Sequence, residues 1–63
     1  MKALIKNHPE HKYWVELQDR VPGSQKFETF RSYWTDESVE EITAYLKGMY
    51  PKAGEIEIID QSK

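Results

Sequence analysis

Residues 12–34 place aromatic side chains on both faces of a predicted β-hairpin, and this constrains the fold more than any other feature of the chain. Side chains alternate between the two faces of a strand. The apolar face of the first strand, residues 12–19, carries Tyr13, Val15 and Leu17. Trp14 lies on its other face. A chain of 63 residues buries only about 60% of the surface that its unfolded form exposes, so one aromatic face is expected to remain open.

The second strand of the hairpin, residues 26–34, leaves two assignments of its aromatic residues open. A regular strand directs Phe27 and Tyr33 toward the core, and Phe30 and Trp34 outward. A bulge near Glu28 and Thr29 directs Phe27, Phe30 and Trp34 inward together, and leaves Arg31 and Tyr33 outside. Both assignments leave Trp14 beside another aromatic residue on the open face.

After the hairpin the apolar spacing changes from two to three or four, which predicts a helix over residues 36–49. Its apolar stripe, which is expected to pack as core, consists of Val39, Ile42, Leu46 and Met49. Thr35 or Ser38 can cap the helix, and Ser38 and Glu41 fit a capping box, in which the two side chains bond the first free amides of the helix. Gly48 and Pro51 favour an end of the helix close to them.

Two further strands are expected, at residues 2–6 and 55–60. The last strand should direct the side chains of Ile56 and Ile58 toward the core. Pro22 and Gly23 predict a type II turn in the hairpin loop, because glycine adopts positive φ at no steric cost. Together the elements predict a single α+β domain, a two-layer sandwich of one helix on a mainly antiparallel sheet of three or four strands, in the order β(β)βαβ. Residues 61–63 are expected to fray.

The composition indicates the cellular setting of the protein and the kinds of partner it can bind. The absence of cysteine removes disulfides and thiolate metal sites and favours an intracellular, cytoplasmic setting. The only apolar run near the N-terminus, residues 3–5, is far too short for a signal peptide or a membrane span. The formal net charge is −2, and residues 35–63 hold seven acidic residues and three lysines. This balance argues against a partner held chiefly through phosphates.

The two-sided aromatic hairpin is typical of an interaction surface, because Trp, Tyr and Arg dominate the energetics of protein interfaces. The predicted interaction face consists of Trp14, Phe30, Arg31, Tyr33 and Trp34. A second, acidic surface for a partner is formed by Asp36, Glu37, Glu40 and Glu41. The favoured function is therefore a small non-enzymatic module that binds a protein, as an inhibitor or regulator, or that forms a homodimer.

The alternative is binding of single-stranded nucleic acid. In that case Trp14, Phe30 and Trp34 stack on bases while Lys12, Lys26 and Arg31 hold the backbone. Glu16 and Glu28 lie among these residues and oppose that role. No RNA-binding sequence motif accompanies them, so this alternative depends on composition alone.

The sequence gives no support to an enzyme, a metal site or a cofactor. His8 and His11 are the only histidines, Pro9 lies between them, and no further ligand follows, so an exposed turn is expected there. No glycine-rich phosphate loop or nucleotide-binding pattern is present. The order of hairpin, acidic-capped helix and final strand is similar to that of small phage and mobile-element accessory proteins, including inhibitors of host nucleases and repair enzymes. That likeness implies no role for any single residue.

Overall fold

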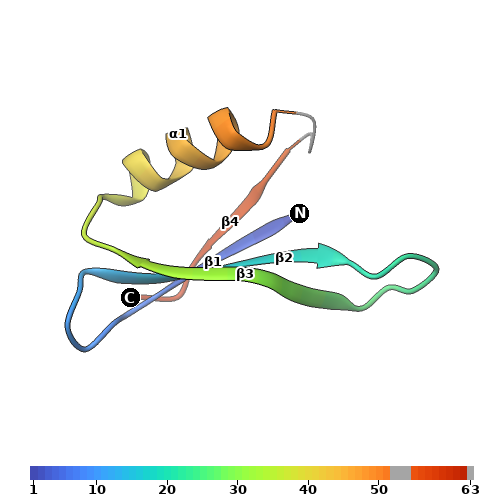
Figure 1. The fold of residues 1–63 in the computed structure, drawn as a ribbon, viewed down its shortest axis with the longest axis horizontal. Coiled ribbons are helices and arrows are strands. Elements are labelled where there is room, and N and C mark those ends of the chain that lie inside the picture. Colours follow the sequence, from blue (N-terminus) through green and yellow to red (C-terminus); the bar gives the residue numbers. More distant parts are fainter. Residues whose placement is uncertain (52–54, 63) are drawn as a thin grey trace.

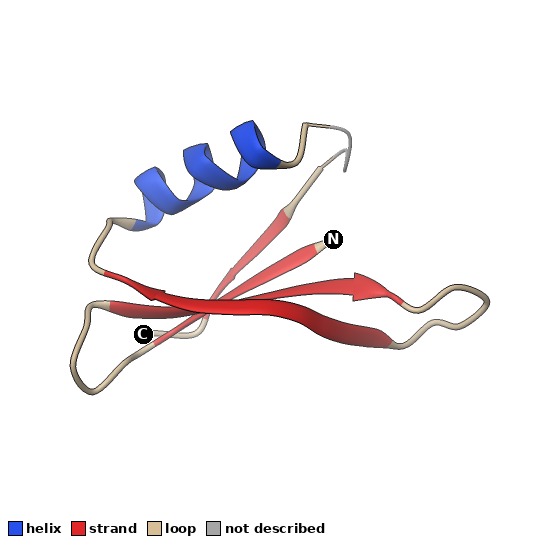
Figure 2. Cartoon of the chain, in the orientation of Figure 1, coloured by secondary structure: helices blue, strands red, loops and turns tan. Residues whose placement is uncertain are grey.

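The computed structural model describes residues 1–51 and 55–62, and in them one helix lies along one face of a four-stranded sheet (Figures 1 and 2). The elements are β1 (Lys2–Lys6), β2 (Tyr13–Arg20), β3 (Phe27–Thr35), α1 (Val39–Met49) and β4 (Glu57–Asp60). The predicted α+β fold of one helix on a sheet is confirmed. No helix in the described residues is long and apolar enough to span a membrane.

The sheet has the order β3-β2-β1-β4 and is mixed rather than mainly antiparallel. β1 pairs with β2, and β2 with β3, in antiparallel fashion, because short turns connect these strands. The chain then returns through α1 and enters at the free edge of β1, where β4 runs parallel to β1. A parallel partner needs such a crossover, and α1 lies within it. β3 is consequently one of the two edge strands.

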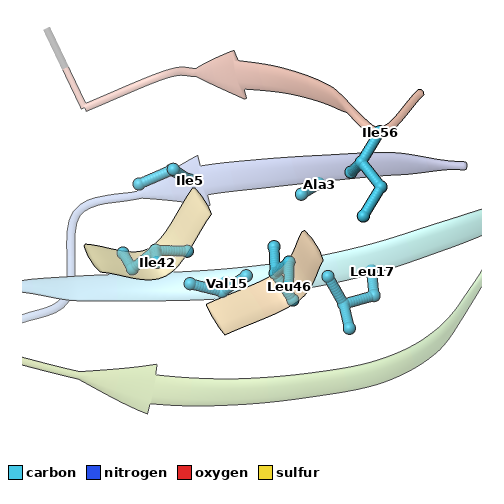
Figure 3. Packing of buried hydrophobic residues seen from close by; sticks show 7 residues of the cluster. All are labelled: Ala3, Ile5, Val15, Leu17, Ile42, Leu46 and Ile56. Carbon is cyan, nitrogen blue, oxygen red and sulfur yellow. The ribbon is translucent and has the colours of Figure 1, made fainter. Parts of the chain in front are cut away.

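The hydrophobic core lies between α1 and the sheet (Figure 3). Its buried members are Ala3, Ile5, Val15, Leu17, Ile42, Leu46 and Ile56. Ile58 and Val39 pack against this core from partly buried positions, so most of the predicted core is confirmed. Met49 is the exception, because its side chain is 43% exposed and lies beside β3 instead of under the helix.

The helix begins later than the sequence predicts. Ser38 is its N-cap, and the capping box is complete, since the Glu41 amide donates to the Ser38 hydroxyl and the Ser38 amide donates to the Glu41 carboxylate, each over 3.2 Å. Thr35 still pairs with Tyr13 in the sheet, so residues 36–38 are used to turn the chain from β3 into α1. Asp36 therefore precedes the helix and is not part of its first turn.

The hairpin between β2 and β3 contains the predicted turn. The Ser24 amide donates to the Val21 carbonyl over 3.0 Å, and Gly23 has a φ of 77°, as a type II turn requires. A bulge also exists, but it lies at Phe30, between the pairs Leu17↔Arg31 and Gln18↔Thr29. Because the extra residue comes after residue 29, the alternation of residues 27–29 is reversed relative to residues 31–35.

The end of the chain is tied to β1. The Gln61 amide donates to the Ile5 carbonyl over 2.7 Å, which continues the pairing of β4 by one residue. The Asn7 side chain donates to the Ser62 carbonyl over 3.1 Å. Residue 63, the last of the three expected to fray, lies outside the described residues.

Candidate functional site

The predicted interaction face is divided between the two sides of β3. Tyr33 lies opposite Val15 and Arg31 lies opposite Leu17, so both side chains share the side of the sheet that faces α1. Trp34 lies opposite Trp14 on the open face. Neither sequence assignment describes this arrangement fully. The regular strand places Tyr33 and Trp34 correctly, but Phe27 lies opposite Arg20 on the open face because of the bulge.

Phe30, the bulged residue, lies on the helix side with Arg31. Its ring meets the ring of Tyr50 edge-on, with 6.2 Å between centroids. The Arg31 Nη1 donates to the Met49 sulfur over 3.0 Å and to the Tyr50 hydroxyl over 3.4 Å. These contacts gather one exposed group of side chains at the junction of β3 and the end of α1. We call it the Arg31 patch, and its members are Phe30, Arg31, Tyr45, Met49 and Tyr50.

Tyr33 lies beneath the Arg31 patch and contacts two of its members. Its ring meets Tyr45 at 6.3 Å between centroids, and the Arg31 guanidinium lies 5.5 Å from the centre of the Tyr33 ring. The Tyr33 hydroxyl is buried and has no hydrogen-bond partner among the described residues. Burial is the main cause that raises the pKa of Tyr33, so the phenol is neutral at physiological pH.

Arg31 has only neutral neighbours in this patch. A thioether sulfur, a phenol hydroxyl and the face of a tyrosine ring surround its guanidinium. Hydrogen bonds with Tyr50 and then Tyr45 raise the pKa of Arg31 above its ordinary value. The ion pairs in the described part of the chain are Lys6–Glu16 and His11–Asp36, and neither includes Arg31. Among the described residues, therefore, no carboxylate forms an ion pair with Arg31.

The open face carries a second group of rings near the β1–β2 turn, the Trp–His cluster, which consists of His8, His11, Trp14 and Trp34. The rings of His11 and Trp34 stack face to face, 3.7 Å apart and 7° from parallel. The rings of His8 and Trp14 lie 5.9 Å apart and 29° from parallel. The turn is exposed at Asn7, Pro9, Glu10 and Lys12, as expected, but both histidines are partly buried against the tryptophan rings. The sequence analysis missed these contacts because the turn folds back over the strands.

Hydrogen bonds fix the orientation of both histidines. The amides of Glu10 and His11 donate to His8 Nδ1 over 3.0 and 3.1 Å, so that nitrogen acts as the acceptor of both hydrogen bonds. His11 Nδ1 donates to the Asp36 carboxylate over 3.2 Å, and the Lys12 amide donates to the other Asp36 oxygen over 2.9 Å. The Lys12 amide, followed by His11, lowers the pKa of Asp36.

This lowered pKa predicts that the protein loses stability in acid through Asp36. A carboxyl group with a lower pKa in the folded state stabilises that state fully above its unfolded pKa, and loses the contribution as the pH falls through the folded pKa. We expect Asp36→Asn to melt below the parent at neutral pH and to match it at strongly acidic pH, as followed by circular dichroism. A difference in melting temperature that stays constant with pH would contradict the prediction.

The predicted acidic surface is mostly engaged within the chain. Asp36 accepts from Lys12 and His11, Glu37 accepts from the Thr35 hydroxyl over 3.2 Å, and Glu41 closes the capping box. Glu40 is exposed and makes no hydrogen bond or ion pair with another described residue. Three of the four carboxylates thus have structural partners that a basic binding partner would need to displace.

Three cations of the open face contact other side chains of the chain, whereas Lys12 and Lys26 are exposed. Lys6 pairs with Glu16 over 2.6 Å, which is the main cause that lowers the pKa of Glu16. Lys2 lies 4.2 Å from the centre of the Phe27 ring, and Arg20 lies 5.8 Å from it. His11 already covers one face of the Trp34 ring, which limits how bases can stack on the open face.

The sequence analysis did not identify Tyr45 and Tyr50 as site residues. The sequence does contain an indication for Tyr45. It lies four residues before Met49, and this spacing places the two side chains on one face of the helix. No group of three or more His, Cys, Asp or Glu side chains suited to a metal ion occurs in residues 1–51 and 55–62. Comparison of the chain with protein-family models, with curated proteins and with solved structures finds no match.

Proposed function

We propose that this protein is a non-enzymatic module that binds another protein along strand β3. One observation carries the proposal: the four large apolar side chains that are well exposed in the described residues all lie on or against β3. Phe30 and Trp34 belong to the strand itself, with exposed fractions of 50% and 54%. Tyr45 and Met49 reach it from α1.

The chemistry of this surface supports protein binding. Aromatic residues, Met and Arg are enriched in protein interfaces, and a cluster of exposed apolar side chains on a small protein usually marks a contact surface. β3 is also an edge strand, so the backbone groups on its outer side have no neighbouring strand in the part of the chain that the structure describes. The Arg31 patch on one side and Trp34 on the other place apolar contacts along both flanks of that edge.

A module of this kind acts by occupying a surface of its partner, which is the mode of action of an inhibitor or regulator. The Trp–His cluster has a supporting role in the proposal, because it fixes the ring of Trp34 at the end of β3. A second copy of the chain is one possible partner, and the experiment below distinguishes it from a different protein.

Photo-crosslinking in the cells that produce the protein tests this proposal. The photoreactive residue benzoylphenylalanine is introduced at Phe30, at Tyr45, or at Glu57 as a control. Glu57 is exposed on β4, at the opposite edge of the sheet. We expect one discrete protein adduct from positions 30 and 45 and none from position 57. Mass spectrometry then shows whether the adduct is a second copy or a different protein.

Two results would contradict the proposal. One is the absence of any adduct from positions 30 and 45. The other is an equal yield of the same adduct from position 57, which would show that contact does not depend on β3. The circular dichroism spectrum of each labelled protein serves as the control for folding.

Single-stranded nucleic acid is the competing ligand, and we predict that it binds no tighter than about 10⁻⁵ M at physiological salt, which is the range of non-specific association. The reason is that Lys6 is paired with Glu16, and Trp34 is stacked on His11. Tryptophan fluorescence, which stacked bases quench, provides the assay. Quenching at low micromolar concentrations of a mixed-sequence oligonucleotide that disappears with added salt would favour the nucleic-acid alternative.

A further inference from the structure

The unmatched charge of Arg31 indicates what the partner brings to the patch. Its guanidinium lies between Met49 and Tyr50 and over the ring of Tyr33, with no carboxylate of this chain in an ion pair with it among the described residues. Guanidinium groups bind carboxylates through two parallel hydrogen bonds, and such bonds are stronger than those between neutral groups. Arg31 is exposed, so its remaining donors are accessible.

The side chains around Arg31 indicate which residues should flank the partner's carboxylate. Phe30 and Met49 are 50% and 43% exposed and flank the guanidinium on the strand and on the helix. Both are apolar, and they offer contacts to apolar side chains next to the acidic one. Partner side chains that cover Phe30 and Met49 also exclude water from the ion pair, which strengthens it.

A second copy of this chain is a poor occupant for the patch. Arg31 is the middle residue of β3, Phe27–Thr35, so two-fold pairing of two β3 strands about their centres places Arg31 opposite Arg31 of the second copy. Like charges directly opposite each other destabilise a strand pair. The acidic residues before and within the first turn of α1 are mostly bound within their own chain.

We infer that the Arg31 patch binds a segment of a different protein that carries an aspartate or glutamate between apolar residues, with the carboxylate on Arg31 and the apolar side chains on Phe30 and Met49. This inference rests on the proposed function, because it names the class of segment that docks along β3. The edge of β3 favours an extended segment, since an extended chain can lie alongside an edge strand.

Selection of peptides from a random nine-residue library displayed on phage tests the inference. The baits are the parent protein, Arg31→Gln, Arg31→Glu and the matched control Arg20→Gln. Arg20 is also an exposed arginine near an aromatic ring, but it lies on the open face. We expect the parent and Arg20→Gln to enrich peptides with an acidic residue between apolar ones. Arg31→Gln should lose this preference, and Arg31→Glu should enrich a basic residue instead.

Affinity measurements with the most enriched peptide give the expected size of the effect. Arg31→Gln should weaken binding at least about tenfold, because a hydrogen bond to a charged group is lost. Replacing the acidic residue of the peptide by its amide should weaken binding to the parent to a similar extent. This second change leaves the protein untouched, so it keeps the test decisive if Arg31→Gln fails to fold.

The outcomes separate this inference from the proposed function. Enriched peptides without an acidic preference that still lose affinity for Phe30→Ala and Tyr45→Ala would overturn the inference and leave the proposed function standing. Peptides that bind these two variants as well as the parent would overturn both. A stable dimer in sedimentation that dissociates with Phe30→Ala would assign the patch to a second copy and overturn the inference alone.

Discussion

Replacing Leu46 by alanine is expected to lower the free energy of unfolding by about 2–5 kcal/mol, the usual range for emptying a core site. Leu46 is fully buried between α1 and the sheet, close to Val15 and Leu17 in Figure 3. Domains of this size have little stability to spare, so we expect the variant to unfold at or near room temperature. Chemical denaturation followed by circular dichroism measures the effect.

The neighbouring residue provides the control for this substitution. Lys47 is exposed, and Lys47→Ala should change the free energy of unfolding by no more than about 0.5 kcal/mol, as is usual for surface positions. A Leu46→Ala protein that unfolds at the same denaturant concentration as the parent would show that the helix does not cover the sheet as described.

The second large effect is expected in binding and not in folding. Phe30→Ala should weaken the complex with the partner by about 2 kcal/mol or more, because a central aromatic residue of an interface is a typical hot spot. The ring is 50% exposed and lies at a bulge, so its loss should leave the fold intact. Titration calorimetry with the partner or the selected peptide measures the change.

Phe27 is the matched control for this substitution. It lies on the same strand but on the open face, opposite Arg20 and under Lys2. Phe27→Ala should therefore leave the affinity close to that of the parent. If Phe27→Ala weakens binding more than Phe30→Ala does, the docking surface is the open face of the sheet and not the Arg31 patch.

The parts of the fold that follow local rules could be predicted from the sequence. The capping box of Ser38 and Glu41, the turn at Gly23 and the stripe of Ile42 and Leu46 each depend on residues a few positions apart. Local chemistry determines these features, so they can be predicted without knowing how distant parts of the chain fold.

The site was harder to predict because it depends on the exact position of one bulge. Moving the extra residue of β3 from residues 28–29 to Phe30 exchanges the faces of the side chains around it. The sequence permits a bulge in this strand, but no local pattern of residues fixes its position. Its place depends on cross-strand pairs such as Val15↔Tyr33, which join residues far apart in the chain.

Contacts between distant segments were also beyond the sequence analysis. The stack of His11 on Trp34 and the contact of Arg31 with Met49 join residues 23 and 18 positions apart. The parallel pairing of β4 with β1 joins the two ends of the chain. Each of these features needs the complete sheet before it can form, so no short window of residues predicts it.

Amide hydrogen exchange of the complex tests most directly whether a partner docks along β3. Addition of the selected peptide should slow exchange in residues 30–35 and in the last turn of α1, because the partner covers both. Exchange in β4 should not change, since β4 lies at the opposite edge of the sheet. Protection confined to β4, or to the open face of β1 and β2 with β3 unchanged, would contradict the account.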